Sequence, residues 1–207
     1  NVREKYNLEL MAKNTLAVYE EALHNFRMLV LKFGSLGDII LSSAALRALR
    51  KKFSAGYKIS LLVYEENKEV VLRCPYIDEL LVFDRKNRDK GFKGLWAMGI
   101  ALRRKQFDLT VDLQNNRKSH LLSFLTLAPE RYGYRRKLGF LLNHTVKETT
   151  IPLGPLEHQF RILNLLGIKL EDKRLEVWPG NEAREHVEAL LGQEWLSSKQ
   201  KLVGINF

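Results

Sequence analysis

A carboxylate and two glycines lie within five residues of each other near the start of the chain, directly after an apolar run. The segment is Leu29-Val-Leu-Lys-Phe-Gly-Ser-Leu-Gly-Asp38. A strand that turns into a helix here directs free backbone N–H groups and the helix dipole at an anion. We therefore predict that Gly34, Ser35 and Gly37 bind substrate, since glycine permits a tight turn and close approach to the backbone. The spacing is neither the G-x-G-x-x-G of dinucleotide sites nor a P-loop.

Asp38 has two interpretations at this position. As the residue that caps the following helix, its side chain would accept hydrogen bonds from first-turn N–H groups, which is a structural task. As a carboxylate at the carboxyl end of a strand, it would lie where open α/β sheets bind ligands. The spacing alone leaves both interpretations open.

A second polar stretch follows another apolar run and reads Val111-Asp-Leu-Gln-Asn-Asn-Arg-Lys-Ser119. Asp112, Gln114 and Asn115 offer hydrogen bonds, and Arg117 and Lys118 offer positive charge for a phosphate or carboxylate. We predict that Gln114, Asn115, Arg117 and Lys118 contact substrate. The alternative is an ordinary polar loop between a strand and a helix.

The segment Arg131-Tyr-Gly-Tyr-Arg-Arg-Lys137 mixes basic and aromatic side chains, which could stack on sugars or bases and bind phosphates. We include Arg135 and Arg136 among the predicted substrate-binding residues. No RNA-recognition or zinc-finger pattern surrounds the segment, so we expect no nucleic-acid partner. The five histidines lack the paired spacing of metal ligands, and we expect no metal site.

Positive charge is concentrated in one part of the chain. The 207 residues have 34 Lys and Arg against 24 Asp and Glu, a net charge of +10. Between Arg85 and Lys147 there are fifteen Lys and Arg and four Asp and Glu, so this segment alone carries +11. A local excess of this kind favours an anionic partner, although a basic surface that only confers solubility is the alternative.

Composition also excludes several classes of protein. Cys74 is the single cysteine, which excludes a disulfide framework and a cysteine-rich zinc site and indicates a reducing compartment. No apolar run approaches the roughly 20 residues that span a bilayer.

The chain starts at Asn1 rather than Met, and it ends at Phe207 directly after a strand-like run. We therefore expect a piece of a longer polypeptide.

Strand-like and helix-like segments alternate along the sequence. The predicted strands are 27–33, 57–63, 79–83, 107–112 and 131–134. The predicted helices are 1–23, 38–53, 65–73, 91–104, 117–127, 156–166 and 182–196, and 135–155 is predicted as a loop or linker. Alternation of this kind indicates a parallel sheet with helices on both faces.

Together these segments resemble glycosyltransferase family 9, the ADP-heptose:lipopolysaccharide heptosyltransferases. The resemblance covers about residues 27–207. It depends on four stretches: 29–40 with its Gly-Asp turn, 107–119 with the pattern D-x-x-x-D-x-Q…K-S, the helix 158–167, and the final strand 203–207. Residues 1–23 resemble the closing helix of family 4 glycosyltransferases, as in a fused polypeptide; the alternative is an ordinary amphipathic helix packed on the sheet.

The resemblance implies the amino-terminal, Rossmann-like domain of a GT-B type enzyme, truncated. Its expected parts are an N-terminal helix (1–24), an acceptor-binding domain (25–155), and crossover helices with the first strand of a donor domain (156–207). It also implies a metal-independent, inverting reaction without cofactor in which Asp38 is the general base. This piece alone should then be inactive, because the nucleotide-sugar site lies mainly in the other domain.

The implied substrates are a nucleotide sugar, ADP-heptose, and a lipid-linked, anionic glycan such as the lipopolysaccharide core. The implied location is the cytoplasm, with peripheral contact at the inner face of the cell membrane. The alternative function is a non-catalytic Rossmann-like module that binds a nucleotide or an acidic glycan.

Overall fold

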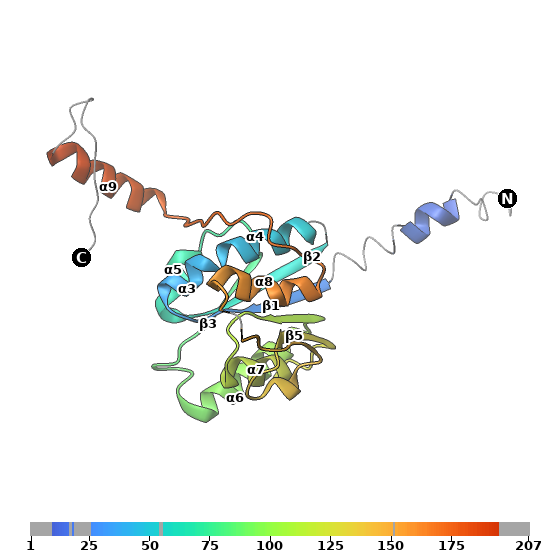
Figure 1. The fold of residues 1–207 in the computed structure, drawn as a ribbon. Helices are drawn as coiled ribbons and strands as arrows, with labels where there is room; N and C mark the ends of the chain where they lie inside the picture. The colour runs from blue at the N-terminus through green and yellow to red at the C-terminus, as the bar shows by residue number, and fades with distance from the viewer. Residues whose placement is uncertain (1–9, 17, 19–25, 54–55, 151, 195–207) are drawn as a thin grey trace.

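The computed structural model describes residues 10–16, 18, 26–53, 56–150 and 152–194. Within them, six parallel strands form one sheet in the order β3-β2-β1-β4-β5-β6 (Figure 1). The strands are β1 (Phe26–Leu31), β2 (Tyr57–Tyr64), β3 (Glu79–Phe83), β4 (Leu109–Asp112), β5 (Glu130–Tyr134) and β6 (His144–Val146). This order is that of the Rossmann fold.

Helices cover both faces of the sheet (Figure 1). They are α3 (Leu36–Leu41), α4 (Ser43–Lys52), α5 (Lys68–Val71), α6 (Gly91–Arg103), α7 (Arg117–Leu125) and α8 (Pro155–Leu165). A further helix, α9 (Asn181–Glu194), lies away from the sheet (Figure 1). Two short 3-10 helices, η1 (Glu65–Asn67) and η2 (Gly139–Leu141), lie in the connections. Residues 10–16 are also helical, within the segment for which a helix was predicted.

Each face of the sheet has its own apolar core, because successive strand side chains point to opposite faces. Met28 and Val30 of β1 lie in the core under α3, α4, α5 and α8. Leu29 and Leu31 lie in the core under α6 and α7. All four of these β1 side chains are fully buried, which explains why this strand reads as a continuous apolar run. The predicted parallel sheet with helices on both faces is confirmed.

Two predictions about elements were wrong. The predicted helix 38–53 is two helices, since Ser42 ends α3 with a tight turn in which its N–H and its hydroxyl both donate to the carbonyl of Ile39. The predicted loop 135–155 contains η2 and the edge strand β6, which pairs with Tyr132–Tyr134. A strand of three residues is too short to show an alternating pattern.

The segment after the sheet returns to it. Phe160, Ile162 and Leu163 of α8 are buried in the core beside α4. The chain then passes α4, where Glu176 N–H donates to Ser43 Oγ at 2.9 Å. The predicted domain boundary at 155/156 remains a prediction, and the predicted strand 203–207 lies outside the described residues.

Candidate functional site

The two polar stretches singled out in the sequence meet at one point of the sheet. β1 and β4 are neighbours although β2 and β3 come between them in the chain, so the strand order reverses there. In open α/β sheets, ligands bind outside the carboxyl ends of the strands at such a switch point. The turn after β1 (residues 34–38, the Asp38 turn) and the turn after β4 (residues 112–119, the Asp112 turn) flank it.

A pocket of about 500 Å³ opens at this point. We call it the Asp38 pocket. It brings together four predicted site residues, Gly34, Ser35, Asp38 and Gln114. Its other lining residues are Phe33, Tyr64, Glu66, Asn67, Arg85 and Asn116.

Asp38 is half-buried at the start of α3, and its carboxylate folds back over the turn. Its Oδ2 accepts hydrogen bonds from Ser35 N–H at 3.1 Å and from Ser35 Oγ at 2.9 Å. A Cβ atom at Gly34 would lie 2.5 Å from Asp38 Oδ2, so glycine is required for this arrangement. A Cβ at Gly37 would point into open space. The carboxylate thus stabilises its own turn while it lines the pocket.

Lys32 lies beneath the pocket and was not singled out in the sequence. It is buried at the end of β1, and its Nζ donates to the carbonyl of Leu113 at 3.3 Å, which links the ends of β1 and β4. Burial lowers the pKa of the Lys32 amine, and the negative charges of Asp38 and Asp112 act in the opposite direction. The sequence signal for Lys32 was a lysine next to an apolar strand-like run, because a buried lysine charge requires nearby carboxylates.

Gln114 and Asn115 are both tied to the protein. The side-chain oxygen of Gln114 accepts from Phe33 N–H at 3.1 Å, so this residue lines the pocket and also joins the two turns. Asn115 is buried in the left-handed region at φ 55°, and its Oδ1 accepts from Tyr134 N–H at 3.1 Å. Asn115 therefore holds β5 against the Asp112 turn and is absent from the pocket lining.

The four predicted basic residues lie outside the Asp38 pocket. Arg117 and Lys118 are exposed at the start of α7, directly after the pocket-lining Asn116. Arg135 and Arg136 are exposed after β5, where Arg136 pairs with Glu148 at 3.1 Å. Their roles in substrate binding remain predictions.

Arg85 is the basic side chain that does line the pocket. Its guanidinium lies 4.3 Å from the ring centre of Tyr64 and pairs with Glu66 at 2.6 Å. Tyr64 ends β2 and Arg85 follows β3, so both belong to the carboxyl edge of the sheet. Once the strand order is known, this position at the edge identifies Tyr64 and Arg85 as candidate site residues, but the sequence alone does not give that order.

The basic and aromatic segment 131–137 is largely engaged within the fold. Arg131 donates to the carbonyls of Leu141 and Ala128, at 2.9 and 2.5 Å. The Tyr132 ring stacks on His144, and Tyr134 is buried against His158 at 4.1 Å between ring centres. These side chains complete the fold around β5.

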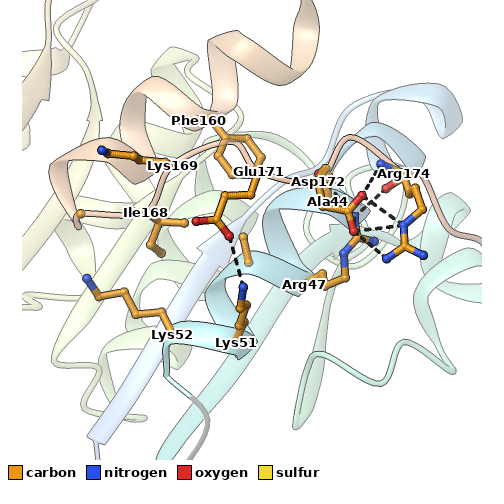
Figure 2. A pocket seen from close by; sticks show the side chains of 12 residues that line it. Ala44, Arg47, Lys51, Lys52, Phe160, Ile168, Lys169, Glu171, Asp172 and Arg174 are labelled. Atoms are coloured by element: carbon orange, nitrogen blue, oxygen red, sulfur yellow. Dashed lines mark hydrogen bonds and ion pairs between the residues drawn. The ribbon is translucent and has the colours of Figure 1, made fainter.

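A second hollow, of about 480 Å³, lies between α4 and the segment after α8 (Figure 2). Two of its cations are paired with carboxylates: Lys51 with Glu171 at 3.2 Å, and Arg174 with Asp172 at 2.8 Å. Lys52 donates to the carbonyl of Leu166 at 2.5 Å. These contacts hold the returning segment on the helix, far from the carboxyl edge.

The described residues contain neither a cluster of metal ligands nor a helix that could cross a membrane. No three His, Cys, Asp or Glu side chains in these ranges come together as metal ligands. Among the helices described, none combines the length and apolar character that a membrane crossing requires.

Comparison with known proteins gave matches among solved structures; no family model and no curated protein sequence matches the chain. A family 9 glycosyltransferase from Veillonella parvula has a TM-score of 0.74 at 24% identity over 84% of this chain. Escherichia coli ADP-heptose lipopolysaccharide heptosyltransferase II has a TM-score of 0.59 at 20% identity, also over 84%. E. coli heptosyltransferase WaaC with ADP has a TM-score of 0.59 at 20% identity over 73%.

The chain spans about half the length of these structures: 51%, 52% and 50% of the three chains. The chain therefore has a Rossmann-like fold that is similar to about half of each of these glycosyltransferase structures.

Proposed function

We propose that this chain is the acceptor-binding domain of an inverting glycosyltransferase, with Asp38 as the general base. The position of one carboxylate carries the proposal. Asp38 lines a pocket at the switch point of a sheet that has the fold of half a heptosyltransferase. A general base must be within hydrogen-bond reach of the hydroxyl it deprotonates, and a pocket of about 500 Å³ gives a sugar hydroxyl access to this side chain.

In the proposed reaction, an acceptor hydroxyl donates its proton to the Asp38 carboxylate as its oxygen forms a bond to the anomeric carbon of the donor. The bond from that carbon to the diphosphate breaks on the opposite face, and the nucleoside diphosphate leaves with the electron pair. The product has inverted configuration at the anomeric carbon. The hydrogen bonds from Ser35 hold the carboxylate in place for this step.

The proposed donor is ADP-heptose, bound mainly by residues outside this domain. E. coli heptosyltransferase WaaC has been solved with ADP and with ADP-2-deoxy-2-fluoro heptose. The proposed acceptor is a lipid-linked anionic glycan, such as the lipopolysaccharide core, at the inner face of the cell membrane. The charge of +11 between Arg85 and Lys147 supports an acceptor that carries phosphates or carboxylates. Arg117, Lys118, Arg135 and Arg136 are the proposed contacts for these groups.

The test is sugar transfer from ADP-heptose by the protein that carries this chain, with Asp38→Asn as the variant. An amide oxygen can still accept the hydrogen bonds from Ser35, but an amide cannot take the proton. We expect kcat to fall roughly 100- to 10,000-fold, with the melting temperature retained.

The matched control is Asp172→Asn, the same chemical change on the α4 side of the domain, where Asp172 pairs with Arg174. It should retain full transfer activity. Activity that survives intact in Asp38→Asn would contradict the assignment of the base.

A further inference from the structure

The outer face of α6 carries large apolar side chains that nothing in the described chain covers. Phe92, Trp96 and Ile100 are 69%, 47% and 41% exposed. Their spacing of four residues places them in one row along the helix. The Phe92 and Trp96 rings stack with their centres 6.1 Å apart. A contiguous exposed row of this kind, unlike a single exposed leucine, marks an interaction surface.

Further exposed apolar side chains lie on the neighbouring elements α7 and η2. α6 and α7 pack closely, since a Cβ at Gly99 would lie 2.5 Å from Leu125 Cδ1. The exposed side chains on these neighbours are Phe124, Leu127 and Phe140. We call Phe92, Trp96, Ile100, Phe124, Leu127 and Phe140 the aromatic face. It lies on the side of the sheet opposite α4 and α8 (Figure 1).

Exposed aromatic residues are confined to this face. Every phenylalanine and tryptophan of the described ranges that is more than a third exposed belongs to it. On the opposite helical layer, the exposed large apolar residues are aliphatic, among them Leu72 and Leu165. Tryptophan and phenylalanine are the side chains that anchor proteins in the interfacial region of a bilayer.

Positive charge surrounds the aromatic row. Residues 90–107 contain five Lys and Arg and no Asp or Glu. Lys93, Arg103 and Arg104 are exposed on α6, next to Trp96 and Ile100 in helical spacing, and none of the three forms an ion pair within the described residues. A helix face that combines aromatic and basic side chains without acidic ones fits an anionic lipid surface. A second copy of the chain would bring like charges together.

The aromatic face begins beside the Asp38 pocket. Phe92 lines a hollow of about 310 Å³ together with Leu95, Lys118 and Arg85. Arg85 also lines the Asp38 pocket, so the two cavities share one side chain. A surface that binds the aromatic face would therefore lie next to the opening through which an acceptor reaches Asp38.

We propose that the aromatic face docks on an anionic bilayer surface, with Phe92, Trp96 and Ile100 inserted among the headgroups and Lys93, Arg103 and Arg104 bound to their phosphates. The inference extends the proposed function, because it identifies where a domain that uses a lipid-linked acceptor would contact the membrane. Docking itself requires only lipid, so it can be tested without sugar transfer.

The test is co-sedimentation of the chain with vesicles of phosphatidylcholine, with and without phosphatidylglycerol. We expect binding to the vesicles that contain phosphatidylglycerol, and a loss of at least roughly tenfold in affinity for the double variant Phe92→Ser, Trp96→Ser. The matched control is Leu72→Ser, Leu165→Ser. Those side chains are 52% and 44% exposed on the opposite layer, and the control should bind as the wild type does.

Charge reversal provides a second arm. The double variant Lys93→Glu, Arg103→Glu should bind phosphatidylglycerol vesicles more weakly than the wild type, although its apolar row is intact. The loss of affinity should be at least as large as the loss that added salt causes for the wild type. Absence of vesicle binding by the wild type, or equal binding by both serine double variants, would overturn the proposal. A wild-type dimer that becomes a monomer in Phe92→Ser, Trp96→Ser would also overturn it, because the face would then be a protein interface.

The two proposals fail separately. Asp38→Asn leaves the aromatic face unchanged and should bind vesicles as the wild type does, whatever its effect on transfer. Loss of vesicle binding with retained transfer to a soluble, delipidated acceptor would leave the assignment of Asp38 untouched.

Discussion

The Asp38 turn and the Asp112 turn both lead from a buried strand into a helix, and both place an aspartate at the switch point. Their carboxylates differ in exposure. Asp38 is half-buried and lines the pocket, whereas Asp112 is fully buried. Asp112 Oδ1 accepts from the N–H groups of Gln114 and Asn115, both at 2.9 Å. Both carboxylates therefore accept backbone hydrogen bonds, and the difference in exposure leaves only that of Asp38 accessible from the pocket.

The position of each aspartate relative to its strand explains the difference. Asp112 is the last residue of β4, inside the sheet, and its Oδ2 lies 3.6 Å from Nε2 of the buried His120 on α7. Burial raises the pKa of Asp112 to about 6. Asp38 lies seven residues after the end of β1, beyond the glycine-containing turn that leads out of the sheet. A longer turn brings the carboxylate to the pocket.

The largest effect that separates the two turns is on stability. Asp112→Ala leaves the N–H groups of Gln114 and Asn115 buried without an acceptor, so we expect the free energy of unfolding to fall by about 4 kcal/mol. Asp38→Ala removes hydrogen bonds at an exposed turn and should cost below about 1 kcal/mol. Urea denaturation of the two variants measures both values.

A matched variant tests the reason for that difference. Asp112→Asn retains an oxygen that can accept from both N–H groups, and should recover most of the lost stability. Equal losses in Asp38→Ala and Asp112→Ala would show that exposure does not distinguish the two carboxylates.

The Asp112–His120 pair also predicts an effect of pH on stability. Burial raises the pKa of Asp112 to about 6, so its contribution to stability is full below about pH 4 and is lost as pH rises through 6. Burial lowers the pKa of His120 to about 4, with Lys137 as a second cause, so its contribution is lost as pH falls from 6.5 through 4. The two contributions therefore change in opposite directions over the same pH range.

Single substitutions separate these slopes. Relative to the wild type, His120→Leu should lose stability as pH rises from 4 to 6, because the Asp112 slope then acts alone. Asp112→Asn should lose stability as pH falls from 6.5 to 4, because only the His120 slope remains. Urea midpoints at pH 4, 5, 6 and 7 give both profiles. Parallel profiles for the two variants would contradict the assigned shifts.

Much of the fold could be predicted from local patterns. The apolar runs at β1 and β2 are clear in the sequence because most of their residues are buried between two helical layers. β6 was missed because its pairing with β5 depends on a contact between residues twelve apart rather than on its own three residues. The break at Ser42 was missed because it depends on one hydroxyl that bonds to the backbone.

The candidate site was predicted where it is local in sequence. Gly34, Ser35 and Asp38 form one turn, and their contacts follow from spacing. Lys32 and Arg85 were missed because they reach the site only through the order of the strands, which brings β1 beside β4. Asn115 was expected to bind substrate, whereas its contact with Tyr134 depends on the packing of β5.

The smallest predicted effect concerns the N-cap residues of the two helices, Asn116 before α7 and Ser35 before α3. At the Asp112 turn, Asn116 Oδ1 accepts from Ser119 N–H at 2.9 Å, and Asn116 N–H donates to Ser119 Oγ at 3.0 Å. Asn116→Ala should therefore cost about 1 kcal/mol of unfolding free energy. Ser35→Ala should cost about half of that, because α3 is short and the lost hydrogen bond to Asp38 Oδ2 is exposed. Thermal denaturation of the two variants at one pH measures this difference in stability. A larger loss of stability for Ser35→Ala would contradict the comparison, because the cap of the Asp38 turn would then stabilise the fold more than the cap of the Asp112 turn does.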